Sequence, residues 1–395
     1  MVLTGRGSGR GMKGILALLL LVFLAVLLAG CQSTGGQTSP METPLIETPQ
    51  VPAALPPPPP SEAPPALPTP LLFRGDQSSP LRLNFSFNSS GKEEQVSLGL
   101  DPAVLPSRGG GENCILASWR PGDDAVLASY YAGIFRDPGE DALYTPLLSE
   151  LHRIRRSENL NDDEYLELMV HFVQAIPYDP DAPVCPRTPA GVILDGKGDC
   201  DEKSLLLLGL FYREGYDGAL LLFVAENHAT AGIRIDTATQ PSFRVYETGG
   251  KKYVYIETTR PTFIGLYPDE FAAADPVVIP AGNGTIPYRA INNVMEIVST
   301  QKRMEAKMTW LRDTGKEMIG EMEALESRLN SSANYDTQEE YDADYSRYST
   351  LAAQYDEYMA EFLQINDVYQ YILDHQDDRV GVSERIANSK VENLL

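Results

Sequence analysis

The sequence of 395 residues has few of the residues that most often mark a site, with four cysteines, four histidines and two tryptophans. So few cysteines exclude a disulfide-dense small domain, and no cysteine–histidine spacing typical of a zinc site occurs. Basic residues are outnumbered 32 to 55 by acidic ones, and the net charge of −23 argues against a nucleic-acid partner. Neither a phosphate loop nor a dinucleotide fingerprint is present. We therefore expect no metal and no cofactor.

The first 31 residues have the pattern of an export signal. Arg6, Arg10 and Lys13 precede an apolar run from Ile15 to Leu28, which is too short for a comfortable bilayer span. The run ends in Leu28-Ala29-Gly30-Cys31, which resembles the lipobox of prokaryotic lipoproteins. The resemblance implies that Cys31 is lipidated and becomes the mature N-terminus, held at the extracytoplasmic face of the cell membrane. An uncleaved signal anchor is the alternative.

Three further regions follow the signal. Residues 32–72 are crowded with Pro, Ser, Thr and Gly, which predicts a disordered tether. Residues 73–285 mix strand and helix patterns and predict an α+β domain, with the motif-bearing core at 125–270. Residues 286–395 carry apolar side chains, many of them Met and Tyr, at 3-4 spacing with a polar break at 330–334. This pattern predicts a long antiparallel coiled-coil hairpin, which could serve a helical partner or self-association.

Within the α+β region, period-two and period-3.6 patterns predict strands and helices, and a long loop links the last upstream helix to Cys200. We expect helices over 124–135 and 147–154, from 161 to 176 and from 200 to 215, and strands over 81–87, 95–100, 219–225, 228–235, 243–248 and 252–258.

The candidate chemistry centres on Cys200, in Gly198-Asp199-Cys200-Asp201-Glu202-Lys203 at the start of an apolar helix. The helix dipole favours the thiolate, whereas the neighbouring carboxylates oppose it unless Asp199 turns away as the N-cap. His228 and Glu257 follow on two predicted strands, each on the less aliphatic face. A thiol paired with an imidazolium is a reactive nucleophile, and a carboxylate would orient the ring.

These motifs resemble the transglutaminase-like superfamily of papain-type thiol enzymes. The residues that carry the resemblance are Gly198 to Lys203 with Leu205 to Leu208, His228, Tyr255-Ile256-Glu257-Thr258-Thr259, Phe172 to Tyr178 and Ile264 to Pro268. The resemblance implies a papain-like core, in which a central helix carrying the cysteine lies against an antiparallel sheet. It also implies that Cys200 is the nucleophile, His228 the base and acid, and Glu257 the orienting acid. The stretch Cys185-Pro186-Arg187-Thr188-Pro189-Ala190 departs from the family pattern.

An oxyanion hole and a disulfide are also expected. The Cys200 backbone N–H would form an oxyanion hole, with Tyr178 as a second donor, although a packed aromatic is the alternative for Tyr178. Cys114 and Cys185 are left over and could pair in an oxidising compartment. The expected reaction is acyl transfer at an amide of a protein or peptide, by hydrolysis or transamidation. The competing class is a catalytically silent envelope scaffold that uses the hairpin for binding.

Overall fold

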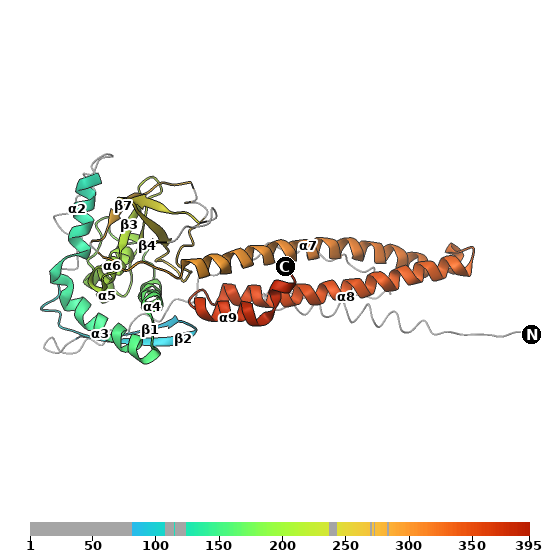
Figure 1. The fold of residues 1–395 in the computed structure, drawn as a ribbon, viewed down its shortest axis with the longest axis horizontal. Helices are drawn as coiled ribbons and strands as arrows, with labels where there is room; N and C mark the ends of the chain where they lie inside the picture. Colours follow the sequence, from blue (N-terminus) through green and yellow to red (C-terminus); the bar gives the residue numbers. More distant parts are fainter. Residues whose placement is uncertain are drawn as a thin grey trace, which may run out of the picture. The chain divides into compact units, whose positions relative to one another are not determined.

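The structure, a computed structural model, describes residues 81–106, 114, 124–236, 243–268, 271, 273–282 and 284–395 (Figure 1). The expected signal, the lipidation site Cys31 and the Pro-rich tether lie outside these residues. The described part is α+β, with antiparallel sheets and a helical C-terminal region, as predicted. Among its helices, none is long and apolar enough to cross a bilayer.

The first described element is a two-stranded hairpin. β1 (Leu81–Ser89) pairs antiparallel with β2 (Lys92–Leu100). Ser90 and Gly91 form the turn, both with positive φ (53° and 70°), and this matches the right-handed twist of a tight hairpin. The rings of Phe85 and Phe87 meet the ring of Phe172 edge-on at 5.6 and 5.5 Å. The hairpin therefore covers the helix that contains Phe172.

A series of described helices leads to the one that begins at Cys200. They are α2 (Asp124–Phe135), α3 (Asp141–Glu158), which follows the short η2 (Pro138–Glu140), α4 (Asp162–Gln174), α5 (Pro189–Asp195) and finally α6 (Cys200–Glu214). Asn161 caps α4 by accepting from the N–H groups of Asp163 and Glu164, which confirms the predicted helix start. The loop expected between α4 and α6 instead contains α5. The sequence pattern did not indicate this helix, because it has only seven residues, begins at a proline and ends before a glycine.

The second sheet supports α6. Its strands are β3 (Gly218–Phe223), β4 (His228–Ile235), β5 (Tyr246–Thr248), β6 (Lys251–Ile256) and β7 (Val277–Pro280), all paired antiparallel in the order β5-β6-β4-β3-β7. α6 packs against β3 and β4, as Figure 1 shows, and its leucines from 205 to 208 are completely buried. β7 was not predicted, because four residues ending at a proline give too short a pattern.

Two long helices form the predicted hairpin. α7 (Ile291–Leu329) and α8 (Gln338–Asp374) lie side by side, linked through η4 (Ser332–Asn334), and α9 (Arg379–Ser389) with η5 (Val391–Asn393) packs at their base (Figure 1). The base shares one hydrophobic core with the α+β part, and its members there include Ile291, Val294, Ile365, Val368 and Val382. The boundary at residue 285 is therefore a change of pattern and not a gap between separate cores.

Candidate active site

Cys200 is the first residue of α6, and its position is fixed by a capping box. Asp199 is the N-cap and accepts from the Glu202 N–H at 3.1 Å, while the Glu202 carboxylate accepts from the Asp199 N–H at 3.1 Å. This reciprocal pair satisfies two N–H groups of the first turn, which have no partner within the helix. The expectation that Asp199 serves as N-cap is confirmed, and Cys200 is left half-buried with a free thiol.

The Cys200 sulfur lies against the first residues of β4. Burial raises the pKa of the thiol to about 11, and the charges of Asp201 and Asp199 act in the same direction. The backbone N–H of Ala229 lies near the sulfur and lowers the pKa of the thiol, although not enough to offset the burial. Burial and the carboxylates therefore outweigh the helix N-terminus and favour the protonated thiol.

The surroundings of Asp201, next to Cys200, disfavour negative charge. Burial raises the pKa of its carboxyl well above the usual range, and so do its hydrogen bond to Asp199 and the charge of Asp199. One of its oxygens, Oδ1, is buried without a hydrogen-bond partner in the described part of the chain. A neighbouring carboxyl group disfavours ionisation of Asp201, since two negative charges in a buried site repel each other. Cys200 thus lies beside an acid pair that disfavours a second negative charge.

His228 and Glu257 belong to one hydrogen-bonded chain, in which Tyr255 stands between them. The Nε2 atom of His228 lies 2.9 Å from the Tyr255 hydroxyl oxygen, and the Tyr255 O–H donates to Glu257 Oε2 at 3.1 Å. The ring of His228 also stacks on Phe271, with centroids 4.5 Å apart. The predicted common face of the two strands is confirmed, because β4 and β6 pair with Gly232 opposite Tyr255.

Tyr255 is the site residue that sequence reasoning missed. Tyr255 belongs to one of the sequence motifs and shares strand parity with Glu257. Glu257 follows the end of β6 and is buried, and its Oε1 accepts from the N–H and the O–H of Thr259 at 2.8 and 2.5 Å. The Gln174 amide donates to the Glu257 carbonyl at 2.8 Å and to the Thr262 carbonyl at 3.1 Å. The carboxylate is thus held in one orientation.

Tyr178 lies at the rim of the site. Its side chain is 50% exposed, and its backbone forms a parallel bridge with Gly198, two residues before the nucleophile candidate. Burial raises the pKa of the phenol, and nearby negative charge raises it further. Tyr178 thus lies beside the segment that leads into Cys200.

A buried ion-pair network holds the loop before α6. Arg187 donates from Nε to Glu202 Oε1 at 2.9 Å and from an Nη atom to Asp179 Oδ2 at 2.6 Å. All three side chains are at least nine-tenths buried, and the same Glu202 closes the capping box below Cys200. Arg187 belongs to the stretch that departs from the family pattern, so the departure has a structural role.

Lys203 lies one turn below Cys200 and is fully buried. Its ammonium donates to the carbonyls of Gln174 and Ile176 at 3.2 and 2.5 Å. Burial lowers the pKa of the amine to about 7, while the charge of Glu257 raises it. Lys203 therefore ties the end of α4 to the start of α6.

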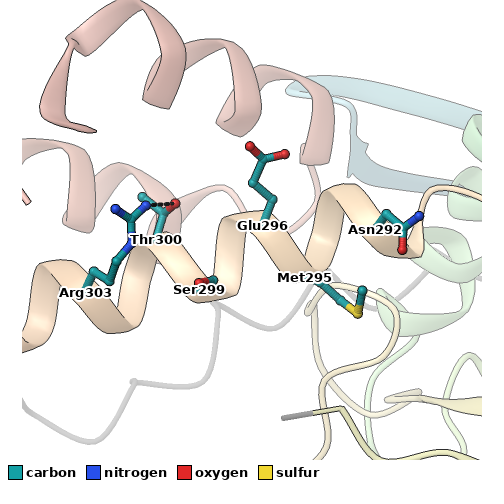
Figure 2. A pocket seen from close by; sticks show the side chains of 6 residues that line it. All are labelled: Asn292, Met295, Glu296, Ser299, Thr300 and Arg303. Carbon is teal, nitrogen blue, oxygen red and sulfur yellow. Dashed lines mark hydrogen bonds between the residues drawn. The ribbon is translucent and has the colours of Figure 1, made fainter. Parts of the chain in front are cut away.

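The other expected features lie around this centre. Cys114 and Cys185 form a disulfide, with Cα atoms 5.7 Å apart. In the described residues no group of three or more His, Cys, Asp and Glu side chains is arranged to hold a metal ion. A separate hollow of about 320 Å³ lies on α7 and is lined by Asn292, Met295, Glu296, Ser299, Thr300 and Arg303 (Figure 2). All six belong to one helix, and none belongs to the Cys200 site.

No family model matches the chain, and comparison with curated proteins and with solved structures found no significant similarity. The motifs of the sequence and the geometry of the described residues are therefore what characterise the site.

Proposed function

We propose that this protein is a transglutaminase-like cysteine enzyme with a papain-type core, which transfers acyl groups from amides of proteins or peptides. The observation that carries the proposal is the hydrogen-bonded chain of His228, Tyr255 and Glu257, because it begins at the start of β4, where the Ala229 N–H lies near the Cys200 sulfur. The chain from His228 through Tyr255 to Glu257 supplies the orienting carboxylate.

In the proposed reaction His228 removes the thiol proton while the Cys200 sulfur attacks the amide carbonyl. The tetrahedral intermediate then expels the amine, which takes that proton from His228, and a thioester remains on Cys200. Water attacking the thioester releases an acid, and an amine attacking it forms a new amide. In both cases His228 accepts the nucleophile's proton and returns it to the leaving sulfur.

The raised pKa of Cys200 favours one kind of catalysis. A resting thiol is a weak nucleophile, so the proton must leave during the attack and not before it. The negative charge passes to the carbonyl oxygen, which the Cys200 N–H at the α6 N-terminus and the Tyr178 phenol would stabilise. This scheme needs a well-placed base more than a preformed ion pair.

The proposed location is the extracytoplasmic face of a membrane, through lipid on Cys31 and the tether of residues 32–72. The Cys114–Cys185 disulfide supports it, because such bonds persist in oxidising compartments. A silent scaffold with the same fold is the second candidate. The observation in its favour is that Cys200 resists ionisation, which would suit a structural thiol equally well.

An activated ester separates the two candidates without knowledge of the natural substrate. The full chain is mixed with p-nitrophenyl acetate, release of nitrophenolate is followed, and acetyl adducts are mapped by mass spectrometry. The enzyme hypothesis predicts a burst with acetyl on Cys200, lost in Cys200→Ala and slowed about 100-fold or more in His228→Asn. Equal acetylation of wild type and His228→Asn would reject it and leave the scaffold.

A further inference from the structure

The hydrogen bonds of Tyr255 carry information about where protons lie. A phenol has one proton to donate and an oxygen that accepts. Its oxygen contacts both His228 Nε2, at 2.9 Å, and Glu257 Oε2, at 3.1 Å. The proton can serve only one of these two contacts, and the other contact must be one in which the phenol accepts.

The contacts of Glu257 show whether the phenol proton is donated to His228 or to Glu257. Its Oε1 receives the N–H and the O–H of Thr259, and the buried Lys203 ammonium lies near enough to interact with its charge. Glu257 accepts at both of its oxygens, since Oε2 receives the Tyr255 O–H. The phenol proton is therefore directed to Glu257. Burial and the charge of Glu257 raise the pKa of Tyr255, so the phenol keeps its proton.

With its proton committed to Glu257, the phenol oxygen can only accept from the imidazole. The Nε2 atom of His228 must then carry hydrogen, and in a neutral ring the lone pair lies on Nδ1. We propose that Tyr255 is a positioning residue, which fixes His228 as the Nε2–H tautomer and so makes Nδ1 the nitrogen that takes the Cys200 proton. The catalytic consequence rests on the proposed function, whereas the assignment of the His228 tautomer is independent of it.

The chain offers a matched control on the same strand. Tyr253 is also fully buried, precedes Tyr255 by two residues on the same face of β6, and donates its O–H to a carboxylate, Asp217, at 3.1 Å. Replacing either tyrosine by Phe removes one buried phenol–carboxylate hydrogen bond at a similar cost in stability. Of the two hydroxyls, it is that of Tyr255 that contacts His228, so a specific effect on His228 separates positioning from general destabilisation.

The test is nitrogen NMR of the full chain labelled with ¹⁵N in the imidazole ring. There are four histidines, and His228→Gln identifies the resonances of interest. The wild type should show the Nε2–H tautomer at pH values where the ring is neutral. Tyr255→Phe should convert His228 to a mixture of tautomers, and Tyr253→Phe should leave it unchanged. Glu257→Gln should also convert His228 to a mixture of tautomers. The double variant Tyr255→Phe/Glu257→Gln should change that mixture little further.

The acetylation burst tests the consequence. Tyr255→Phe should slow acetylation of Cys200 about 100-fold, whereas Tyr253→Phe should leave the rate within about twofold of wild type. An unchanged tautomer in Tyr255→Phe would overturn the inference, and so would an altered tautomer with an unaltered burst. A wild type that gives no burst but loses its tautomer preference in Tyr255→Phe would reject the proposed enzyme and still uphold the assignment of protons around His228.

Discussion

The backbone N–H of Ala229, at the start of β4, lies near the sulfur of Cys200, at the start of α6. A backbone donor stabilises a thiolate without itself changing charge. Here it is opposed by burial and by two carboxyl groups, so the thiol remains protonated at neutral pH. The state of this sulfur is therefore set by its surroundings and should be measurable directly.

Alkylation by iodoacetamide should report the raised pKa of Cys200. Only the thiolate reacts, so between pH 7 and about 11 the rate should rise roughly tenfold per pH unit. At pH 8 the native chain should react more slowly than the chain unfolded in urea, whose thiols have ordinary pKa values. A rate already at its plateau at pH 6 would show instead the preformed thiolate–imidazolium pair that the sequence suggested.

Removing the acid pair of Asp199 and Asp201 should change the pH dependence of Cys200 alkylation. The double variant Asp199→Asn/Asp201→Asn removes both carboxyl groups, while the amide oxygen introduced at the N-cap can still accept from the first turn of the helix. The pKa of Cys200 should fall by about one unit, so alkylation at pH 8 should be roughly tenfold faster. Asp236→Asn, at the exposed end of β4, is the control and should not alter the rate. Equal profiles for all variants would contradict the assigned role of the pair.

The buried Lys203 should make stability depend on pH in a predictable direction. Its pKa is about 7 in the folded protein and near 10.5 in the unfolded chain, so the unfolded chain binds more protons between these values. The free energy of unfolding should therefore gain up to about 1.4 kcal/mol per pH unit above pH 7 from this group. Urea unfolding of Lys203→Met should lack that contribution, while Lys252→Met, which is exposed, should retain it. Parallel pH profiles of wild type and Lys203→Met would refute the assignment.

Arg187 should contribute far more to stability than the other cation that contacts Asp179. Arg187→Met leaves Glu202 buried without its cation and Asp179 with only the half-exposed Lys197, which should cost about 3–5 kcal/mol in the free energy of unfolding. Lys197 also pairs with Asp179, but its side chain is 50% exposed, so Lys197→Met should cost less than about 1 kcal/mol. Urea unfolding at pH 7 measures both variants. Equal losses in the free energy of unfolding would show that burial of the ion pairs does not explain the contribution of Arg187.

Features of the site that depend on a single element were predictable from the sequence. The start of α6, its cap and the common face of His228 and Glu257 follow from spacing along one helix or strand. The insertion of Tyr255 between them was not predictable, because it depends on the register of β4 against β6 and on side-chain length. The pKa of Cys200 was not predictable either, since burial and the orientation of Asp201 arise only when the elements pack together.

The same distinction applies to the C-terminal region, where the heptad pattern predicted the hairpin but not its attachment. Arg379, the first residue of α9, donates to Glu167 on α4 at 2.6 Å, and the Tyr288 hydroxyl donates to the same oxygen at 2.6 Å. Burial raises the pKa of Glu167, while the Arg379 charge opposes this effect. A buried carboxylate of this kind depends on its cation, so we expect Arg379 to hold α9 in place.

Arg379→Met should therefore destabilise the chain by about 3 kcal/mol and speed hydrogen exchange of the α9 amides from Val382 to Ser389. Arg385→Met, on the same helix but paired with the exposed Asp367, should change neither measurement appreciably. The double variant Glu167→Met/Arg379→Met removes the stranded charge and should recover much of the lost stability. If the double variant were as unstable as Arg379→Met, the cost would come from lost packing of the long side chain, and the ion pair would not be what fixes α9 to α4.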